Sequence, residues 1–329
     1  MWATSDTLGP MDNMQKLVPN IWCNRSAEAV AAFYEEAFGA AGFAVSSAVE
    51  ARYPETGLPD FQQEFAGQPV TVNVEVDGYL LTLINAGEDF RPSPGMSFML
   101  NFDPLKFGGN QGGDRGGDED QARAALDVLW EELSRDGTER MPLGEYPFSP
   151  HYGWVEDKFG VNWQLMLTSP EGAPRPFLMP AMMFDGPAQD RAEEAAKFYV
   201  ELFNNTHPQT AEVGNISRYP ERSGKAEAGA LAFGEFRVGD QWFVVMDNGS
   251  GQDHGLDGIS LLVNCADQEE IDLLWDALSA DPGAEQCGWL KDQFGMSWQI
   301  VPANLEELLQ RPDAFVHMMQ MNKLVIDDF

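Results

Sequence analysis

Two glutamines are the side chains in this sequence best placed for recognition chemistry, because each occupies the same position in one of two copies of a motif. They are Gln164 and Gln299. An amide donates and accepts hydrogen bonds, and its oxygen can also join a metal site beside stronger ligands. Strand alternation should point both glutamines away from their neighbours Trp163 and Trp298 and into a cavity. The alternative is that they only satisfy neighbouring backbone groups.

Six further candidates lie in or beside repeated positions: Trp154, Trp289, Arg52, Arg218, His151 and Cys287. The two tryptophans could line a cavity or belong to the core. The two arginines recur at a strand end, where a guanidinium could bind a ligand anion or pair with a surface carboxylate. Cys287 could be a nucleophile, but no basic partner is near in sequence, which favours an unreactive thiol. His151 stands where the second copy has Gln286, so chemistry there is not shared by both copies.

The motif is one of four blocks that occur twice in the same order, which identifies a tandem duplication. The matched blocks are 27–38 with 192–203, 52–54 with 218–220, 126–133 with 271–278, and 154–166 with 289–301. We expect an N-terminal tail (1–15), a first domain (16–168), a proline-rich linker (169–176), a second domain (177–304) and a helical tail (305–329). Changing offsets between the blocks place two insertions in the first domain, at 104–120 and 138–150; the first is glycine-rich and is expected to be a surface loop.

Hydrophobic periodicity predicts a strand, a helix and then several strands, twice in each half. In the first half we expect strands at 18–23, 44–52, 70–76, 79–85, 97–102, 151–156 and 161–167, and helices at 27–38 and 120–134. The second half repeats this order, with helices at 191–203 and 268–279. Asp77-Gly78 predicts a two-residue hairpin turn, and Ser26 is a suitable N-cap. Residues 313–326 are expected to form an amphipathic tail helix.

Composition excludes several partners. The 329 residues include 53 acidic and 20 basic side chains, for a net charge of −33. Such a surface repels nucleic acid and anionic lipid. No segment reads as a membrane span or a signal peptide, so a cytoplasmic protein is expected. The three cysteines are widely spaced and read as reduced thiols.

The doubled βαβββ pattern, the Phe-Tyr-x-x-x-Phe end of the first helix and the Asp-x-Phe-Gly-x-x-Trp-Gln hairpin together resemble the vicinal oxygen chelate superfamily. This group includes glyoxalase I, bleomycin-resistance proteins and extradiol dioxygenases. Residues 286–302, preceded by 259–265, are similar to its PhnB-like branch, often labelled 3-demethylubiquinone-9 3-methyltransferase. The resemblance covers 16–170 and 177–325. It implies an α+β fold in which four βαβββ units form two glyoxalase-like cups in tandem, one cup in each half, with helices on the convex side.

Enzymes of that superfamily hold a divalent metal with histidine, glutamine and glutamate. By alignment, Gln164 and Gln299 fall at the position of the glutamate ligand. The first-strand ligand falls near Pro19 or Pro180, and the third near Met96 or Ile259. One neutral amide without two strong donors does not hold a catalytic divalent ion, so we expect no metal and no cofactor.

We therefore expect a protein that binds a small metabolite in one or both cups, as a monomer with pseudo-symmetric halves or as a homodimer. The first alternative is an enzyme of the superfamily, either a metal-dependent lyase or isomerase or, by the family label, a methyltransferase. Against the latter, Gly249-Ser-Gly251 is not a glycine-rich turn of a doubly wound sheet. The second alternative is an assembly module with vestigial cups. Ligand identity and catalysis are not decided by these residues.

Overall fold

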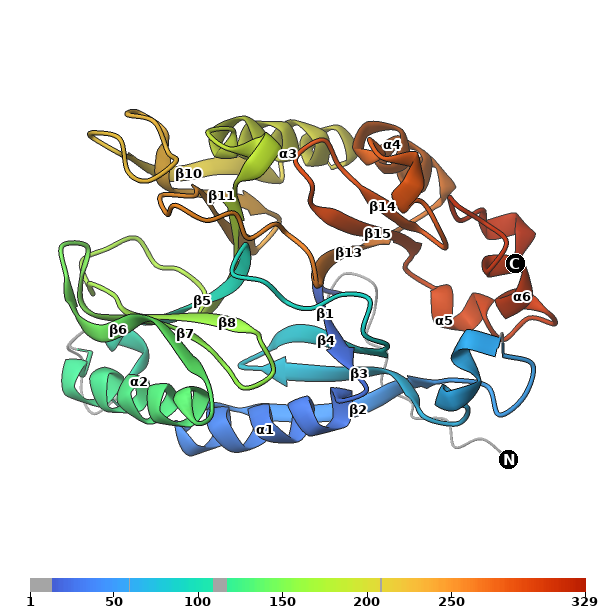
Figure 1. The fold of residues 1–329 in the computed structure, drawn as a ribbon, viewed down its shortest axis with the longest axis horizontal. Coiled ribbons are helices and arrows are strands. Elements are labelled where there is room, and N and C mark those ends of the chain that lie inside the picture. The colour runs from blue at the N-terminus through green and yellow to red at the C-terminus, as the bar shows by residue number, and fades with distance from the viewer. Residues whose placement is uncertain (1–13, 59, 109–116, 208) are drawn as a thin grey trace.

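The computed structural model describes residues 14–58, 60–108, 117–207 and 209–329, and Figure 1 shows its fold. The elements form four consecutive units. Unit 1 contains β1 (Leu17–Asn24), α1 (Ala27–Ala40), β2 (Val45–Arg52), β3 (Pro69–Val76) and β4 (Tyr79–Ala86). Unit 2 contains β5 (Met96–Phe102), α2 (Glu119–Ser134), β6 (Thr138–Tyr146), β7 (Ser149–Glu156) and β8 (Asn162–Leu167). Unit 3 contains β9 (Leu178–Phe184), α3 (Ala192–Thr206), β10 (Ala211–Arg218), β11 (Leu231–Val238) and β12 (Gln241–Asp247). Unit 4 contains β13 (Ile259–Cys265), α4 (Gln268–Leu278), β14 (Trp289–Lys291) and β15 (Ser297–Pro302).

Local sequence signals account for much of this order. Asp77 and Gly78 both have positive φ, 49° and 81°, as a two-residue turn between β3 and β4 requires. Ser26 does precede α1, but its side chain makes no capping hydrogen bond. The strands and helices predicted for the two halves are confirmed with shifts of a few residues at their ends, whereas the predicted tail helix is not.

The second predicted insertion contains a strand. Residues 138–146 form β6, which pairs with β7 and makes the last strand of its sheet. Of the first insertion, residues 109–116 lie outside the described residues. Its described ends form the 3-10 turn η3 (Pro104–Lys106) and the start of α2.

Unit 4 lacks the counterpart of β6, so the expected fourth βαβββ unit is one strand short. The C-terminal tail contacts the turn that precedes β14, where the amides of Cys287 and Gly288 donate to the carbonyls of Met321 (2.8 Å) and Asn322 (2.7 Å). The tail is not the single helix predicted at 313–326. It consists of α5 (Leu305–Leu308), α6 (Ala314–Met318) and η6 (Ile326–Asp328). Residues 321–322, whose carbonyls accept these hydrogen bonds, lie between α6 and η6 and belong to neither.

Each sheet combines strands from both halves of the chain. The seven-stranded sheet has the order β14-β15-β13-β1-β4-β3-β2, and the eight-stranded sheet has the order β10-β11-β12-β9-β5-β8-β7-β6. Units 1 and 4 share the first sheet through antiparallel pairing of β1 with β13. Units 2 and 3 share the second through β5 and β9. We call the concave faces of these sheets cup A and cup B.

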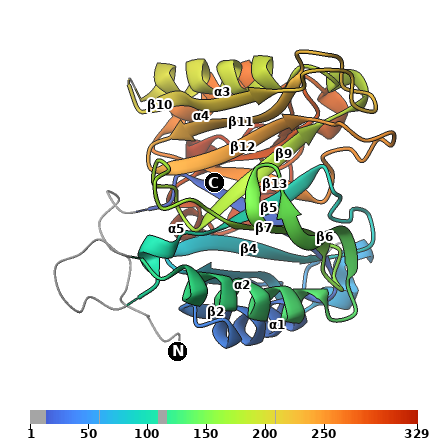
Figure 2. The same cartoon turned by 90° about the vertical axis from the view of Figure 1, so that its left-hand side faces the viewer.

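The fold class is thus confirmed, with two glyoxalase-like cups, but the expectation that each half closes its own cup is wrong. Figures 1 and 2 show α1 and α2 along one side of the molecule and α3 and α4 along the opposite side. Each half therefore supplies one helical layer, and each cup lies between the halves. Local periodicity cannot reveal this, because a strand edge pairs equally well with either of two similar partners.

Glycines allow the two connections between units to touch where they cross at the centre of the molecule. A Cβ on Gly95 would lie 1.7 Å from the carbonyl oxygen of Gly255. A Cβ on Gly258, whose φ is +81°, would lie 2.1 Å from the carbonyl carbon of Arg91. Ser93 Oγ also donates to Gly255 O at 2.7 Å. The exchange of strands between the halves depends on this close backbone approach.

Gly95→Ala is expected to destabilise the protein by about 2–4 kcal/mol, because the new methyl group meets backbone that cannot move alone. The free energy of unfolding, measured by urea titration, tests this. Gly251→Ala is the matched control, since a Cβ there meets nothing within 4 Å. Equal effects of the two substitutions would contradict the proposed role of the crossing.

Candidate ligand-binding cups

A row of polar side chains crosses the floor of cup A. Backbone register aligns Ser260 of β13 with Asn20 of β1, Asn20 with Thr82 of β4, and Thr82 with Asn73 of β3. At one end Gln299 Nε2 donates to Ser260 Oγ at 2.9 Å. Near the other end Thr82 Oγ1 donates to Asn73 Oδ1 at 2.8 Å. The row offers neutral donors and acceptors along one line.

The centre of this row contains an unpaired donor. Asn20 is 2% exposed, and its Nδ2 has no hydrogen-bond partner among the described residues. An unpaired buried amide costs about 1–3 kcal/mol. Asn20 faces away from the helices, because its neighbours Ile21 and Leu17 belong to the helix-side core. A ligand acceptor would offset this cost.

The row continues to a carboxylate at the rim. Asn73 Nδ2 donates to Glu50 Oε2 at 2.8 Å. Burial raises the pKa of Glu50, and the nearby Glu306 of the tail raises it further, while the bond from Asn73 lowers it. Two carboxyl groups near each other at the rim disfavour an anionic ligand.

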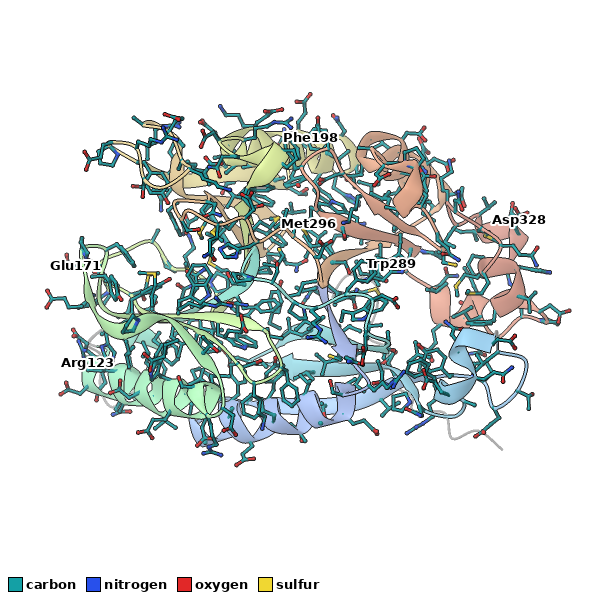
Figure 3. The ribbon with its side chains drawn as sticks, viewed as in Figure 1. Arg123, Glu171, Phe198, Trp289, Met296 and Asp328 are labelled. Carbon is teal, nitrogen blue, oxygen red and sulfur yellow. The ribbon has the colours of Figure 1, made fainter. Side chains whose placement is uncertain are left out.

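Aromatic rings form one wall of cup A. The ring of Trp22 lies 5.0 Å from that of Phe90 and 6.4 Å from that of Trp289, centroid to centroid, both edge to face. Trp22 Nε1 donates to the carbonyl of Gly87 at 2.8 Å, which fixes its orientation. Figure 3 labels Trp289 on the same side of the molecule as Asp328 of the tail.

The tail packs onto the concave face beside this wall. Its Leu308 and Leu324 are buried in one cluster with Val301, and Leu262 packs against that cluster. Val301 and Leu262 alternate with the helix-facing Ile300 and Leu261, so they point into the cup. The C-terminal tail therefore covers part of cup A.

Cup B repeats the register of cup A with different chemistry. Ser97 of β5 aligns with Ala181 of β9, and Ala181 aligns with Val244 of β12. Ala181 and Val244 thus occupy the positions that Asn20 and Thr82 have in cup A. Gln164 is satisfied on both sides, because its Nε2 donates to Ser97 Oγ (2.9 Å) and its Oε1 accepts from the Tyr152 hydroxyl (2.6 Å).

The rest of the floor of cup B is largely apolar. One hydrophobic cluster on this face contains Met99, Met166, Met179, Met246, Phe233 and Trp242 around Ala181 and Val244. Methionine side chains adapt to irregular shapes, so this surface suits apolar contact rather than directional hydrogen bonding. The two cups of the duplicated chain have therefore diverged.

The structure divides the eight sequence-predicted residues into three groups. Gln164 with Trp154, and Gln299 with Trp289, are cross-strand neighbours on the concave faces, opposite the buried Trp163 and Trp298 as expected. Gln299 has no equivalent of the Tyr152 phenol, because Cys287 stands at that position. Its amide therefore keeps more capacity to bind a ligand than that of Gln164.

Three candidates lie away from the cups. His151 Nε2 contacts Asp127 Oδ1 on α2 at 2.6 Å, on the helix side of the sheet. Arg218 pairs with Glu193 on α3 at 2.7 Å, and Arg52 donates to the carbonyl of Gly67 at 3.2 Å. Both repeated arginines thus have partners within the protein.

Cys287 lies at the edge of cup A with its sulfur 3.8 Å from that of Met319. Burial raises the pKa of its thiol, which opposes formation of the nucleophilic thiolate. The pKa values of Cys23 and Cys265 are raised to about 12 by burial as well. Burial thus disfavours the thiolate form of all three cysteines.

The aspartates of the repeated motif are structural hubs. Asp157 is 3% exposed; it accepts from the Tyr34 hydroxyl at 2.9 Å, from Trp163 Nε1 at 3.0 Å and from two turn amides. Asp292 accepts in the same way from Tyr199 (2.7 Å) and Trp298 (2.8 Å). Burial raises the pKa of both carboxyl groups although these hydrogen bonds lower it. Each hub joins the two units of one half.

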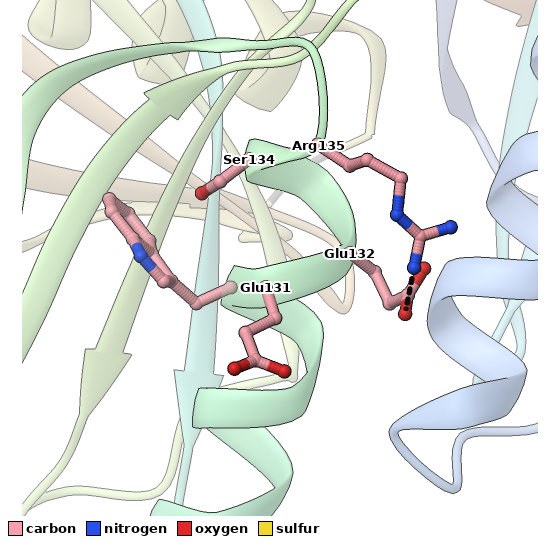
Figure 4. A pocket seen from close by; sticks show the side chains of 5 residues that line it. Glu131, Glu132, Ser134 and Arg135 are labelled. Atoms are coloured by element: carbon pink, nitrogen blue, oxygen red, sulfur yellow. Dashed lines mark hydrogen bonds and ion pairs between the residues drawn. The ribbon is translucent and has the colours of Figure 1, made fainter.

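Two surface hollows lie outside both cups. The first, of about 370 Å³, is lined by Trp130, Glu131, Glu132, Ser134 and Arg135 at the end of α2 (Figure 4). The second lies between α1 and β2. The first is an open surface crossed by the Arg135–Glu132 ion pair at 2.6 Å, so we place the candidate site in the cups on the basis of side-chain chemistry.

The residues of the cups do not fit the divalent metal site of the superfamily's enzymes. Pro19, Met96 and Ile259 do not supply the inward side chains, because strand alternation turns them to the helix side. The inward neighbours are Asn20 and Ser260, both neutral, and the described residues contain no group of three His, Cys, Asp or Glu side chains able to hold a metal. Neutral amides and hydroxyls are weak ligands for transition metals.

Sequence reasoning missed Asn20, Ser260, Thr82 and Asn73, because isolated polar residues in apolar strands carry no motif. The available signal was the polar residue at the centre of a buried strand. Asn20 interrupts the apolar strand 17–24, where an unpartnered amide would be costly.

Two cups built from four related units define a glyoxalase-like fold. A glyoxalase I mutant from Zea mays has a similar structure, with a TM-score of 0.50 and 11% identity over 89% of this chain and 94% of that chain. The family model of 3-demethylubiquinone-9 3-methyltransferase matches residues 119–166 and 177–301, more than half of the chain. The chain therefore belongs to that family, the PhnB-like branch.

Shorter solved structures match about half of the chain. A PhnB protein from Bacillus cereus is 26% identical and covers 47% of this chain and 100% of its own length, with a TM-score of 0.36. A protein from Pseudomonas aeruginosa is 19% identical and covers 47% of this chain and 98% of its own, with a TM-score of 0.34. Among curated proteins, the comparison finds no match. Within the described residues, no helix combines the length and apolarity that crossing a membrane requires.

Asp292→Asn is expected to lower the free energy of unfolding by about 2–4 kcal/mol. The NH2 group of asparagine would face hydrogen-bond donors that now bind the carboxylate, in a site closed to water. Denaturant titration measures this. Asp276→Asn, at a side chain 78% exposed, is the matched control. A loss no greater than that of the control would remove Asp292 from its role as a hub.

Proposed function

We propose that this protein binds a small polar metabolite in cup A, without the divalent metal that enzymes of the superfamily use. The observation that carries the proposal is the buried, unpaired Nδ2 of Asn20 at the centre of the polar row. A buried donor of this kind calls for an acceptor, which a bound ligand or a water molecule supplies. The partner that fits is an oxygen or nitrogen acceptor of a ligand.

The chemistry around Asn20 narrows the ligand class. Gln299 and Thr82 offer further neutral hydrogen-bonding groups on the same face. Trp22 and Trp289 offer aromatic surface to a flat or apolar part of the ligand. Glu50 and Glu306 at the rim, together with a net charge of −33, disfavour anions. A neutral or cationic metabolite with a carbonyl or hydroxyl group meets these conditions.

The methyltransferase activity in the family's name is not the function that these residues support. Both sheets are mixed and carry antiparallel pairs, whereas the usual cofactor site for methyl transfer lies at the carboxyl end of a doubly wound parallel sheet. Gly249-Ser-Gly251 follows β12, at the end of an antiparallel hairpin. An enzymatic role in cup A would instead use neutral hydrogen bonds to orient a substrate.

Asn20→Leu tests the ligand site after a thermal-shift screen of metabolites has supplied a binder. The substitution should remove the ligand-induced rise in Tm, because the donor is lost, yet leave the free protein at least as stable as before. Gln164→Leu in cup B is the control with the opposite pattern: it should lower the Tm of the free protein, since Gln164 bonds on both sides, and leave binding intact. A protein destabilised by Asn20→Leu that still binds the metabolite would rule out this role for Asn20.

Protein purified from metal-replete medium is expected to contain no stoichiometric nickel, zinc, iron or manganese, because the cups present amides and hydroxyls. Elemental analysis measures this. The same protein should neither isomerise hemithioacetals nor cleave catechols, since both reactions in this superfamily use the metal to bind neighbouring oxygens. One tightly bound transition metal per cup would overturn the proposal and favour an enzyme.

A further inference from the structure

We propose that cup B is a binding site for a guanidinium group or a comparably flat cation, and that Arg175 occupies it as an intramolecular ligand. Arg175 belongs to the linker between the two halves rather than to either sheet. Cup B is separate from cup A and differs from it in chemistry, so a cation site in cup B and a metabolite site in cup A can be tested independently.

The guanidinium of Arg175 is held as a bound ligand would be. Its Nε and Nη2 donate to Glu235 Oε1 (2.9 Å) and Oε2 (2.8 Å), a bidentate pair. Its Cζ lies 3.8 Å from the ring centroid of Trp242. The side chains of Arg175 and Glu235 are only 15% and 6% exposed. A carboxylate fork beside an aromatic face is the arrangement that recognises flat cations.

Glu235 and Trp242, which contact Arg175, are held in place by the sheet and do not depend on the linker. Glu235 lies on β11 and also accepts from the amide of Asn215 on β10 at 3.2 Å. Trp242 lies on β12 and fills space that Gly214 leaves open, since a Cβ on Gly214 would lie 2.7 Å from its ring. Carboxylate and ring would therefore remain in place if Arg175 left.

The site is specific to cup B. Register places Glu235 beside Val244, and in cup A the same register places Asn73 beside Thr82. Trp242 likewise pairs with Arg237, at the position where Leu80 pairs with Glu75. At these two positions cup A has Asn73 and Leu80, whereas cup B has Glu235 and Trp242.

Fastening the linker to the sheet does not by itself account for the ion pair between Arg175 and Glu235. The linker is already fixed next to Arg175 by two hydrogen bonds from Asn101. Its side-chain Nδ2 donates to the carbonyl of Pro176 at 2.9 Å, and its backbone N–H donates to the carbonyl of Phe177 at 2.7 Å. A buried ion pair adds little net stability, since both groups lose their hydration. A site for a cation, occupied by the chain's own arginine until a ligand displaces it, explains both the burial and the stacking.

Arg175→Ala empties the site and makes it testable with ethylguanidinium chloride as the probe. We expect the variant to gain a saturable change in tryptophan fluorescence and a rise in Tm at millimolar ethylguanidinium. Ethylammonium, a point charge without the flat fork, should act at least about tenfold more weakly. The wild-type protein should respond only at much higher ethylguanidinium concentrations, because Arg175 competes for the site as an intramolecular ligand.

Two matched variants complete the experiment. Glu235→Gln in the Arg175→Ala background should abolish the ethylguanidinium response, and Arg140→Ala, which removes an arginine paired with Glu156 outside the site, should not create one. If Arg175→Ala does not fold, Arg175→Lys keeps a charge while losing the bidentate fork, and ethylguanidinium should displace the lysine. Equal responses to the two cations, or a response that survives Glu235→Gln, would overturn the proposal.

Discussion

Antiparallel pairing of β1 with β13, and of β5 with β9, is the interaction on which the whole molecule depends. It joins a unit of one half to a unit of the other, so neither cup exists within half a chain. Backbone hydrogen bonds do not depend on side-chain identity, which lets the two cups keep one register while their residues change. The pairing is sterically possible because Gly95 and Gly258 let the two connections between units approach each other closely.

The second constraint acts within each half. The buried hubs Asp157 and Asp292 bind the tyrosine of the first helix and the tryptophan of the last strand of the same half. These are the residues that recur in sequence. A duplicated chain keeps what both copies need in order to fold, and therefore the strongest repeats identify architecture rather than function.

The cups differ at the positions where the repeat is weakest. Cup A has an amide, two hydroxyls and a second amide in its central row, and its mouth is partly covered by the C-terminal tail. Cup B has alanine and valine at the two central positions of the equivalent row, with methionines around them and Arg175 against Trp242 at its side. Family membership fixes the scaffold, and these unshared residues carry the chemistry.

The sequence by itself determined the duplication, the α+β class, most strands and helices, and the inward orientation of Gln164 and Gln299, because period and local turn chemistry act over short distances. It could not determine which units share a sheet, since similar strand edges are interchangeable until the connections are folded. It also left Asn20 and the pair of Arg175 with Glu235 unseen. Their importance arises from burial and from partners 60 residues away or more, and only the tertiary structure creates such contacts.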